Sequence, residues 1–145
     1  MNIQLDPNRP YRREEIDFVF KRVKEKLHQE AKKRGGGEQT LFEDCYTGLT
    51  IRGGEPYDYE HIRSAESIFM EYRDRLSNEE IAEVVNCEEN VKVTLRIINQ
   101  SKGKYSFEIW CTSDRISQYN IDLNHANTAV KLADIGILRA AKRFM

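Results

Sequence analysis

The chain reads EHI at residues 60–62 and NVKVTLRIINQSK at residues 90–102, and these two stretches organise the rest of the sequence. The first sets a carboxylate beside an imidazole. The second sets two carboxamides, Asn90 and Asn99, nine residues apart, with the amine of Lys102 three residues further on. A neutral imidazole with an ordinary pKa of about 6.5 can take a proton from water, and carboxylate and amide oxygens bind hard divalent cations. The pattern therefore predicts that these side chains share one site.

Strand signals surround the first stretch. Apolar and β-branched residues occur at 41–42 and 46–51, and the Arg-Gly-Gly at 52–54 is typical of a turn. We therefore expect residues 57–62 to return as the partner strand of 46–51.

The second stretch is predicted to pass from strand to helix. Residues 91–95 favour a short strand or turn, and 97–110 favour a helix that begins close to Asn99. Asn99 could then serve only as an N-cap, which remains an alternative to a role in a site. Two helices are expected between residues 64 and 89, the second opened by a capping box at 77–80.

Long amphipathic helices are expected at both ends of the chain. From residue 12 to 34 the apolar side chains fall at helical spacing, and they are Ile16, Val19, Phe20, Val23, Leu27 and Ala31. The three glycines at 35–37 predict the end of this helix and a hinge. Residues 123–144 predict a final helix, and the polar, proline-containing residues 1–10 predict a flexible lead.

Length and composition restrict the class of protein. A chain of 145 residues fits one domain with its own core, and no apolar run approaches the eighteen or so residues of a membrane span. The first residues lack the basic and apolar pattern of a signal peptide. The cysteines are odd in number and form no C-x-x-C pair: Cys45, Cys87 and Cys111. A disulfide framework and a four-cysteine zinc site are therefore not expected, and a cytoplasmic location is.

The net charge of −1 bears on possible partners. Lysine and arginine supply most of the non-specific affinity of proteins for nucleic acids. Basic residues gather at 21–34 and 92–104, although acids interrupt the first of these runs. We therefore expect any nucleic-acid binding to be weak or assisted by a partner, with a solvated helix face as the alternative for 21–34.

The two stretches together resemble the HNH, or ββα-metal, nuclease motif in its His-Asn-Asn form. The step from Asn90 to Asn99 and the following Lys102 are especially similar to the HNH domain of RNA-guided CRISPR nucleases. The Cys-Tyr-Thr-Gly at 45–48 is similar to the segment that precedes many HNH cores. The resemblance covers roughly residues 45–105.

The resemblance implies a role for each residue of the site. His61 would be the general base, Glu60 and Asn99 would bind one Mg²⁺ or Mn²⁺ ion, and Asn90 would orient the base through its loop. Lys102 would lie near the phosphate. The implied activity is metal-dependent hydrolysis of DNA, duplex or single-stranded, with a possible protein or guide partner that delivers the substrate.

The resemblance also implies a fold. We expect an α+β protein with an HNH-like ββα-metal core at residues 40–110 that contains a helical insertion at 64–85. Residues 1–39 would be an N-terminal helical extension and 111–145 a C-terminal one.

Alternatives remain open at this point. The chain could be a catalytically degenerate HNH-like module that binds nucleic acid or protein, or an RNA-directed nuclease or toxin. Tyr105, Phe107 and Trp110 could stack on bases, although core packing is the simpler expectation. No catalytic role is expected for His28 or His125.

Overall fold

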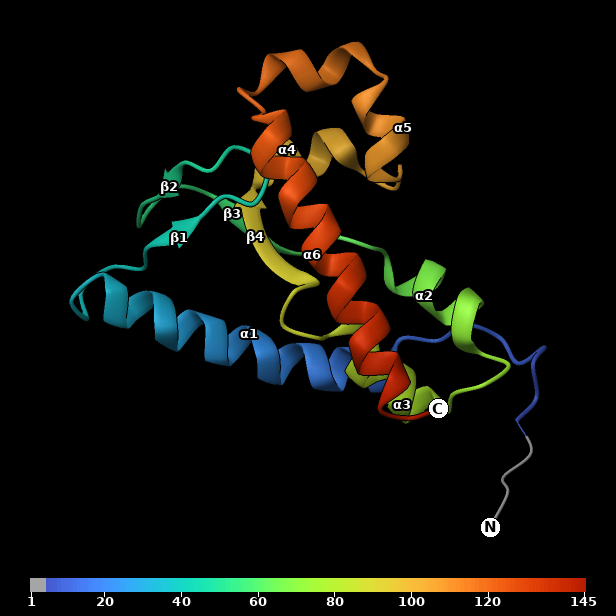
Figure 1. Ribbon diagram of the computed structural model, residues 1–145. Coiled ribbons are helices and arrows are strands. Elements are labelled where there is room, and N and C mark those ends of the chain that lie inside the picture. Colours follow the sequence, from blue (N-terminus) through green and yellow to red (C-terminus); the bar gives the residue numbers. More distant parts are fainter. Residues whose placement is uncertain (1–4) are drawn as a thin grey trace.

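The computed structural model describes residues 5–145 and has a mixed α+β fold (Figure 1). In this part of the chain lie six α-helices and two small two-stranded antiparallel sheets. In chain order the elements are α1 (Glu14–Arg34), β1 (Phe42–Glu43), β2 (Thr50–Ile51), β3 (Tyr57–His61), α2 (Ala65–Tyr72), α3 (Asn78–Val85), β4 (Val91–Leu95), α4 (Arg96–Lys102), α5 (Phe107–Cys111), a 3₁₀ turn (Asp114–Gln118) and α6 (Leu123–Lys142).

The strand pairing differs from the expected hairpin. β3 pairs with β4, from Tyr57 opposite Leu95 to His61 opposite Val91, and not with the segment 46–51. β1 and β2 form a separate small sheet. The predicted partner of 57–62 was therefore wrong, because the pairing that forms spans the whole helical pair between β3 and β4.

A buried aspartate explains why most of the segment 46–51 is not a strand. One carboxylate oxygen of Asp44 accepts hydrogen bonds from the backbone N–H groups of Tyr46 and Thr47, which makes a turn. The other oxygen accepts from the Thr94 hydroxyl and from the N–H of Leu95. The turn is thereby tied to the end of β4, and only Thr50–Ile51 remains for strand pairing.

Most predicted helices are confirmed, with one exception. The helices α1 and α6 follow the amphipathic segments at the two ends, and the capping box between Ser77 and Glu80 opens α3. The expected single helix at 97–110 is instead two helices, α4 and α5. Gly103 separates them with φ of 53°, a left-handed conformation that favours glycine, and the Ser106 side chain caps α5.

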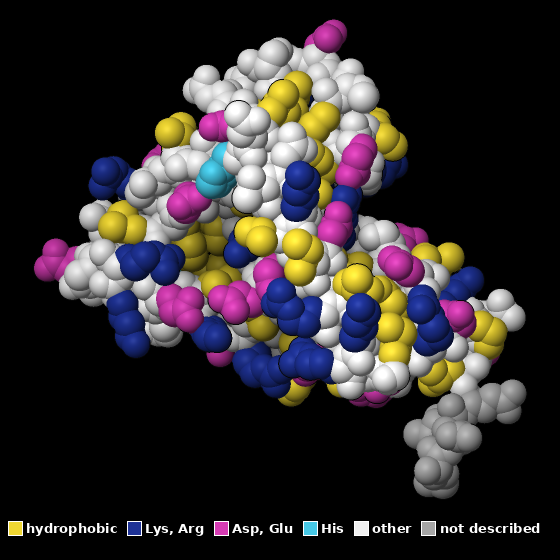
Figure 2. All heavy atoms as spheres, in the orientation of Figure 1, with side chains coloured by type: hydrophobic (Ala, Val, Ile, Leu, Met, Phe, Trp, Pro, Cys, Tyr) yellow, Lys and Arg dark blue, Asp and Glu magenta, His cyan; other side chains and the backbone are white. Residues whose placement is uncertain are grey.

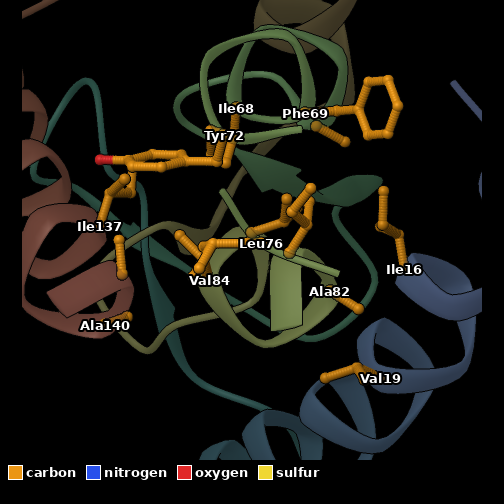
Figure 3. Close-up of a cluster of buried hydrophobic side chains, with 14 residues drawn as sticks. Ile16, Val19, Ile68, Phe69, Tyr72, Leu76, Ala82, Val84, Ile137 and Ala140 are labelled. Carbon is orange, nitrogen blue, oxygen red and sulfur yellow. The ribbon is translucent and has the colours of Figure 1, made fainter. Parts of the chain in front are cut away.

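The larger hydrophobic core joins both terminal helices to the helical pair (Figure 3). Ile16 and Val19 of α1 and Ile137 of α6 pack in the same cluster as the apolar faces of α2 and α3. A second cluster packs α4, α5 and the first half of α6 around Ile62 at the end of β3. Both terminal helices thus contribute to the core of the helical pair, and α6 also contributes to the core around Ile62 and α4.

The expected flexible lead is wrong for its described part. Residues 1–4 lie outside the described residues, but the guanidinium of Arg9 donates hydrogen bonds to Asn78 Oδ1 and to the carbonyls of Arg73 and Leu76. The same group lies over the ring of Phe69. Because a guanidinium offers five N–H donors, one arginine anchors this segment to the end of α2 and the start of α3.

The sheet β3–β4 and the helix α4 lie together. α4 begins directly after β4, and it contacts both strands. No helix among residues 5–145 is long and apolar enough to cross a membrane.

Candidate functional site

A cavity of about 590 Å³ opens where β3 ends, α2 begins and α4 ends. Glu60 and His61 from β3, and Asn99 and Lys102 from α4, all line it. The fifth predicted residue, Asn90, does not line the cavity. Four of the five predicted residues, separated by up to 42 positions in the sequence, thus line the same cavity.

Glu60 lies at the floor of the cavity as a buried carboxylate. Its exposed fraction is 7%, and the Nζ of Lys102 lies 3.4 Å from its Oε1. Its Oε2 is buried without a hydrogen-bond partner, as is the hydroxyl of nearby Tyr46. Burial raises the pKa of Glu60, while Lys102 and Tyr46 oppose that rise. One oxygen of the carboxylate is thus near Lys102, and the other is buried without a geometric hydrogen-bond partner.

The position of the proton on His61 follows from its neighbour Asn86. The Nε2 of His61 lies 2.8 Å from Asn86 Oδ1. The Nδ2 of Asn86 donates to the carbonyls of Ile16 and Ala82, so its Oδ1 must face His61 as an acceptor. A neutral His61 therefore carries its proton on Nε2, and Nδ1 is the nitrogen that can accept a proton.

The imidazole of His61 is packed, and its pKa is not the ordinary value that we expected. The ring lies 4.2 Å from the ring of Phe20, centre to centre. Burial lowers the pKa of His61 to about 4; the hydrogen bond that His61 donates to Asn86 opposes the shift, and the charge of Arg13 adds to it. His61 is therefore neutral at pH 7, which is the form that accepts a proton, but a pKa of about 4 makes it a weaker base than an imidazole with the ordinary pKa.

Asn90 holds the backbone that follows His61. Its Oδ1 accepts from the N–H of Arg63 at 2.8 Å, and its Nδ2 donates to the carbonyls of Arg63 and Val85. Its own carbonyl accepts from the N–H of Ile62 at 2.9 Å. The side chain is fully buried, so any influence on the site must pass through this loop, as the resemblance implies.

Asn99 lies inside α4 and is not a helix cap. Leu95 occupies the N-cap position, so the simpler alternative for Asn99 is wrong. Its Nδ2 donates to Asp58 Oδ2 at 2.9 Å, and its Oδ1 accepts no hydrogen bond from residues 5–145. The amide oxygen of Asn99 is thus available to a ligand of the cavity.

The charged side chains that line the cavity differ in balance from those on the face shown in Figure 2. The face shown in Figure 2 carries interspersed positive and negative side chains, in keeping with the net charge of −1. The cavity is lined by four cationic side chains, Arg13, Arg63, Lys102 and Lys104, against the single carboxylate of Glu60. Arg13 pairs with Asp17, Arg63 with Asp134 and Glu108, and Lys102 with Glu60. Lys104 has no ion pair among residues 5–145, so its charge can attract an anion such as phosphate.

The donors available for a metal ion are oxygens. Residues 5–145 contain no group of three histidine, cysteine, aspartate or glutamate side chains that could hold an ion. The unpaired Oε2 of Glu60 and the free Oδ1 of Asn99 belong to residues that line the same cavity. These two residues fit a hard cation such as Mg²⁺, which keeps several water ligands.

Some contributors to the site had no signal in the sequence. Asn86 belongs to no motif, and its contact with His61 joins residues 25 positions apart. Phe20 and Arg13 reach the cavity because α1 packs against α3. The two other histidines, His28 and His125, do not line the cavity.

No family model, no curated protein and no solved structure matches this chain. The functional argument therefore rests on the residues that line the cavity.

Proposed function

We propose that this protein is a metal-dependent endonuclease of the HNH, or ββα-metal, type. One observation carries the proposal: Glu60, His61, Asn99 and Lys102, which the sequence pattern predicts to act together, line one cavity with a positive lining. The antiparallel pair β3–β4, with α4 directly after it, supports the same proposal.

The chain's own residues supply proton transfer and binding. His61 accepts the proton of a water molecule at Nδ1 while Asn86 holds the N–H of Nε2. The water oxygen bonds to phosphorus, and the bond from phosphorus to the leaving oxygen breaks. A Mg²⁺ or Mn²⁺ ion held by Glu60 and Asn99 would stabilise negative charge on the phosphate and the leaving oxygen. Lys102 and Lys104 attract the substrate backbone.

The proposal is tested by nuclease assays on supercoiled plasmid and on oligonucleotides. We expect cleavage with Mg²⁺ or Mn²⁺ and none in EDTA. His61→Ala should slow cleavage by about 10²–10⁴-fold, the usual cost of losing a general base. His28→Ala, which changes a histidine that does not line the cavity, is the matched control. Undiminished cleavage in EDTA, or more than half of the activity in His61→Ala, would contradict the proposal.

The metal ligands are tested separately from cleavage. Asn99→Ala should weaken the binding of Mn²⁺, measured by titration calorimetry, more than it weakens the binding of nucleic acid. Gln100→Ala is the matched control, because this neighbouring amide is exposed and does not line the cavity. Equal metal affinity in the Asn99 variant and the wild type would remove Asn99 from the proposed ligand set.

The ion pair between Lys102 and Glu60 favours a second candidate function. An amine that already neutralises the buried carboxylate suits a non-catalytic module that binds nucleic acid through the same positive cavity. Binding of oligonucleotides without cleavage, under every divalent cation tested, would favour this module over the endonuclease.

A further inference from the structure

Tyr105 differs from the two aromatic residues that follow it. Phe107 and Trp110 are 4% and 1% exposed and pack in the core beside α6. Tyr105 is 46% exposed and lines the cavity that holds Glu60 and His61. Phe107 also lines the cavity, but it is almost fully buried. Of the three aromatic side chains that the sequence left open to stacking, Tyr105 is therefore the exposed one at the site.

Lys104 precedes Tyr105 in the sequence and is a cationic residue without an ion pair. It is exposed, lines the cavity, and makes no ion pair or side-chain hydrogen bond with any part of the chain from residue 5 onward. Arg63, in contrast, is engaged by Asp134 and Glu108. The backbone N–H of Tyr105 donates to the carbonyl of Lys102 at 3.1 Å, so a tight turn after α4 holds Lys104 and Tyr105 at the rim.

A second cationic residue and a second aromatic residue line the same cavity. Arg13, the N-cap residue of α1, and Phe20, within α1, both line the cavity. The face of Phe20 is already used by His61. Tyr59, which also lines the cavity, is half-buried and packs edge-on against Phe42 and Tyr57. Tyr105 therefore offers the most exposed aromatic ring to a base that enters the cavity.

The depth of the reactive groups restricts the form of the substrate. Glu60 and Lys102 are 7% and 6% exposed, so they lie below the surface at the floor of the cavity. Duplex DNA is stiff over about 150 base pairs, and its phosphates cannot bend into a hollow of about 590 Å³. A single strand can bend, and its unstacked bases are free to stack on aromatic side chains.

We infer that the ligand of this cavity is single-stranded nucleic acid, with one base stacked on Tyr105 and an adjacent phosphate paired with Lys104. As a statement about the substrate of cleavage, this inference rests on the proposed endonuclease function. As a statement about binding, it can be tested without cleavage. Single-stranded DNA and RNA share the chemistry that the cavity offers, so the experiment has an arm for each.

The first experiment measures binding in EDTA, by fluorescence anisotropy, with labelled single-stranded DNA, single-stranded RNA and a duplex of the same sequence. The wild type should bind at least one single strand about tenfold or more tighter than the duplex. Tyr105→Ala should weaken that binding by about fivefold or more, because one base–aromatic stack contributes at least this much. Tyr105→Phe and Tyr105→Trp should retain it.

Ile109→Ala is the matched control, since Ile109 is a similarly exposed apolar residue that does not line the cavity. Duplex binding equal to or tighter than single-strand binding overturns the inference. So does a Tyr105→Ala protein that binds as the Ile109→Ala protein does. Melting curves of each variant check that the fold is retained.

The second experiment repeats the comparison with Mg²⁺ and measures cleavage. Cleavage of single strands that Tyr105→Ala slows supports both proposals. Binding that depends on Tyr105 without any cleavage supports the single-strand site and counts against the endonuclease. If the protein cleaves a duplex as fast as it cleaves a single strand, and Tyr105→Ala does not change either rate, the result supports the endonuclease and overturns the inference.

Discussion

The Nζ of Lys102 lies 3.4 Å from Oε1 of Glu60, and each of the two side chains is less than a tenth exposed. A buried carboxylate requires a cation near it, because transfer of a lone charge from water into the protein costs several kcal/mol. Lys102 meets that requirement with one oxygen and leaves the other unpaired. The same carboxylate is the proposed metal ligand, so the pair connects the stability of the site with its chemistry.

Removal of one partner of this pair should destabilise the protein. Lys102→Ala leaves Glu60 buried and unpaired, and we expect a loss of about 3–5 kcal/mol in the free energy of unfolding. The double variant Lys102→Met with Glu60→Leu should recover most of that loss, because no charge remains buried. Urea unfolding measures both. Lys104→Ala, at an exposed position, is the control. If Lys102→Ala lowers the free energy of unfolding no more than Lys104→Ala does, the ion pair contributes nothing to stability.

The free energy of unfolding should depend on pH through His61. The pKa of His61 is about 4 in the folded protein and about 6.5 in the unfolded chain. The unfolded state therefore binds the proton more readily, and stability falls as pH decreases from about 6.5 to 4. The full loss attributable to His61 is about 3 kcal/mol.

His61→Gln removes this contribution, so the stability of this variant should fall less steeply over the same pH range. Urea unfolding of both proteins in metal-free buffer makes the comparison, because the other titrating groups are common to both. Parallel curves would mean that the imidazole titrates near its ordinary pKa.

Asn86 should control the protonation of His61. In Asn86→Asp a carboxylate replaces the amide oxygen that faces Nε2, and a nearby negative charge favours the imidazolium. We expect the pKa of His61, followed by NMR of its ring protons, to rise by about one unit or more. Asn127→Asp, on the exposed face of α6, should leave it unchanged. An unshifted pKa in the Asn86 variant would argue against the contact.

Asn90→Ala should act through stability. The substitution leaves the N–H of Arg63 and the carbonyls of Arg63 and Val85 without their side-chain partner in a buried place. Each buried polar group left without a partner costs about 1–3 kcal/mol, so we expect a loss of at least about 2 kcal/mol. Thermal and urea unfolding measure it. Nuclease activity that fell far more than the folded fraction would instead indicate a direct role.

Salt should weaken binding to single strands through few charges. Each phosphate neutralised on a single strand contributes about −0.7 to the slope of log K against log salt. With Arg13 and Lys104 engaged, the slope should be about −1.4. Lys104→Ala should reduce its magnitude by about 0.7, and Lys131→Ala, which does not line the cavity, should not change it. A slope unaffected by Lys104→Ala would remove this residue from the contact.

Local patterns in the sequence were sufficient for most of the helices. The apolar spacing of α1 and α6 and the capping box of α3 each involve residues within one or two turns of each other, so the chain segment itself carries the information. The spacing of Asn99 and Lys102 is of the same kind, because α4 sets both on one wall of the cavity. The break at Gly103 was missed, since a glycine alone does not say whether a helix continues.

Contacts between distant segments were decided by the tertiary structure. The choice of β4 as the partner of β3 depends on a turn that Asp44 ties to Leu95, about 50 residues away. The low pKa of His61 arises because α1 and α3 bury its ring beside Phe20 and Asn86. Residue order specifies which side chains are near along a helix or strand. Burial, protonation and charge pairing depend on which elements pack together, and those properties therefore belong to the folded protein alone.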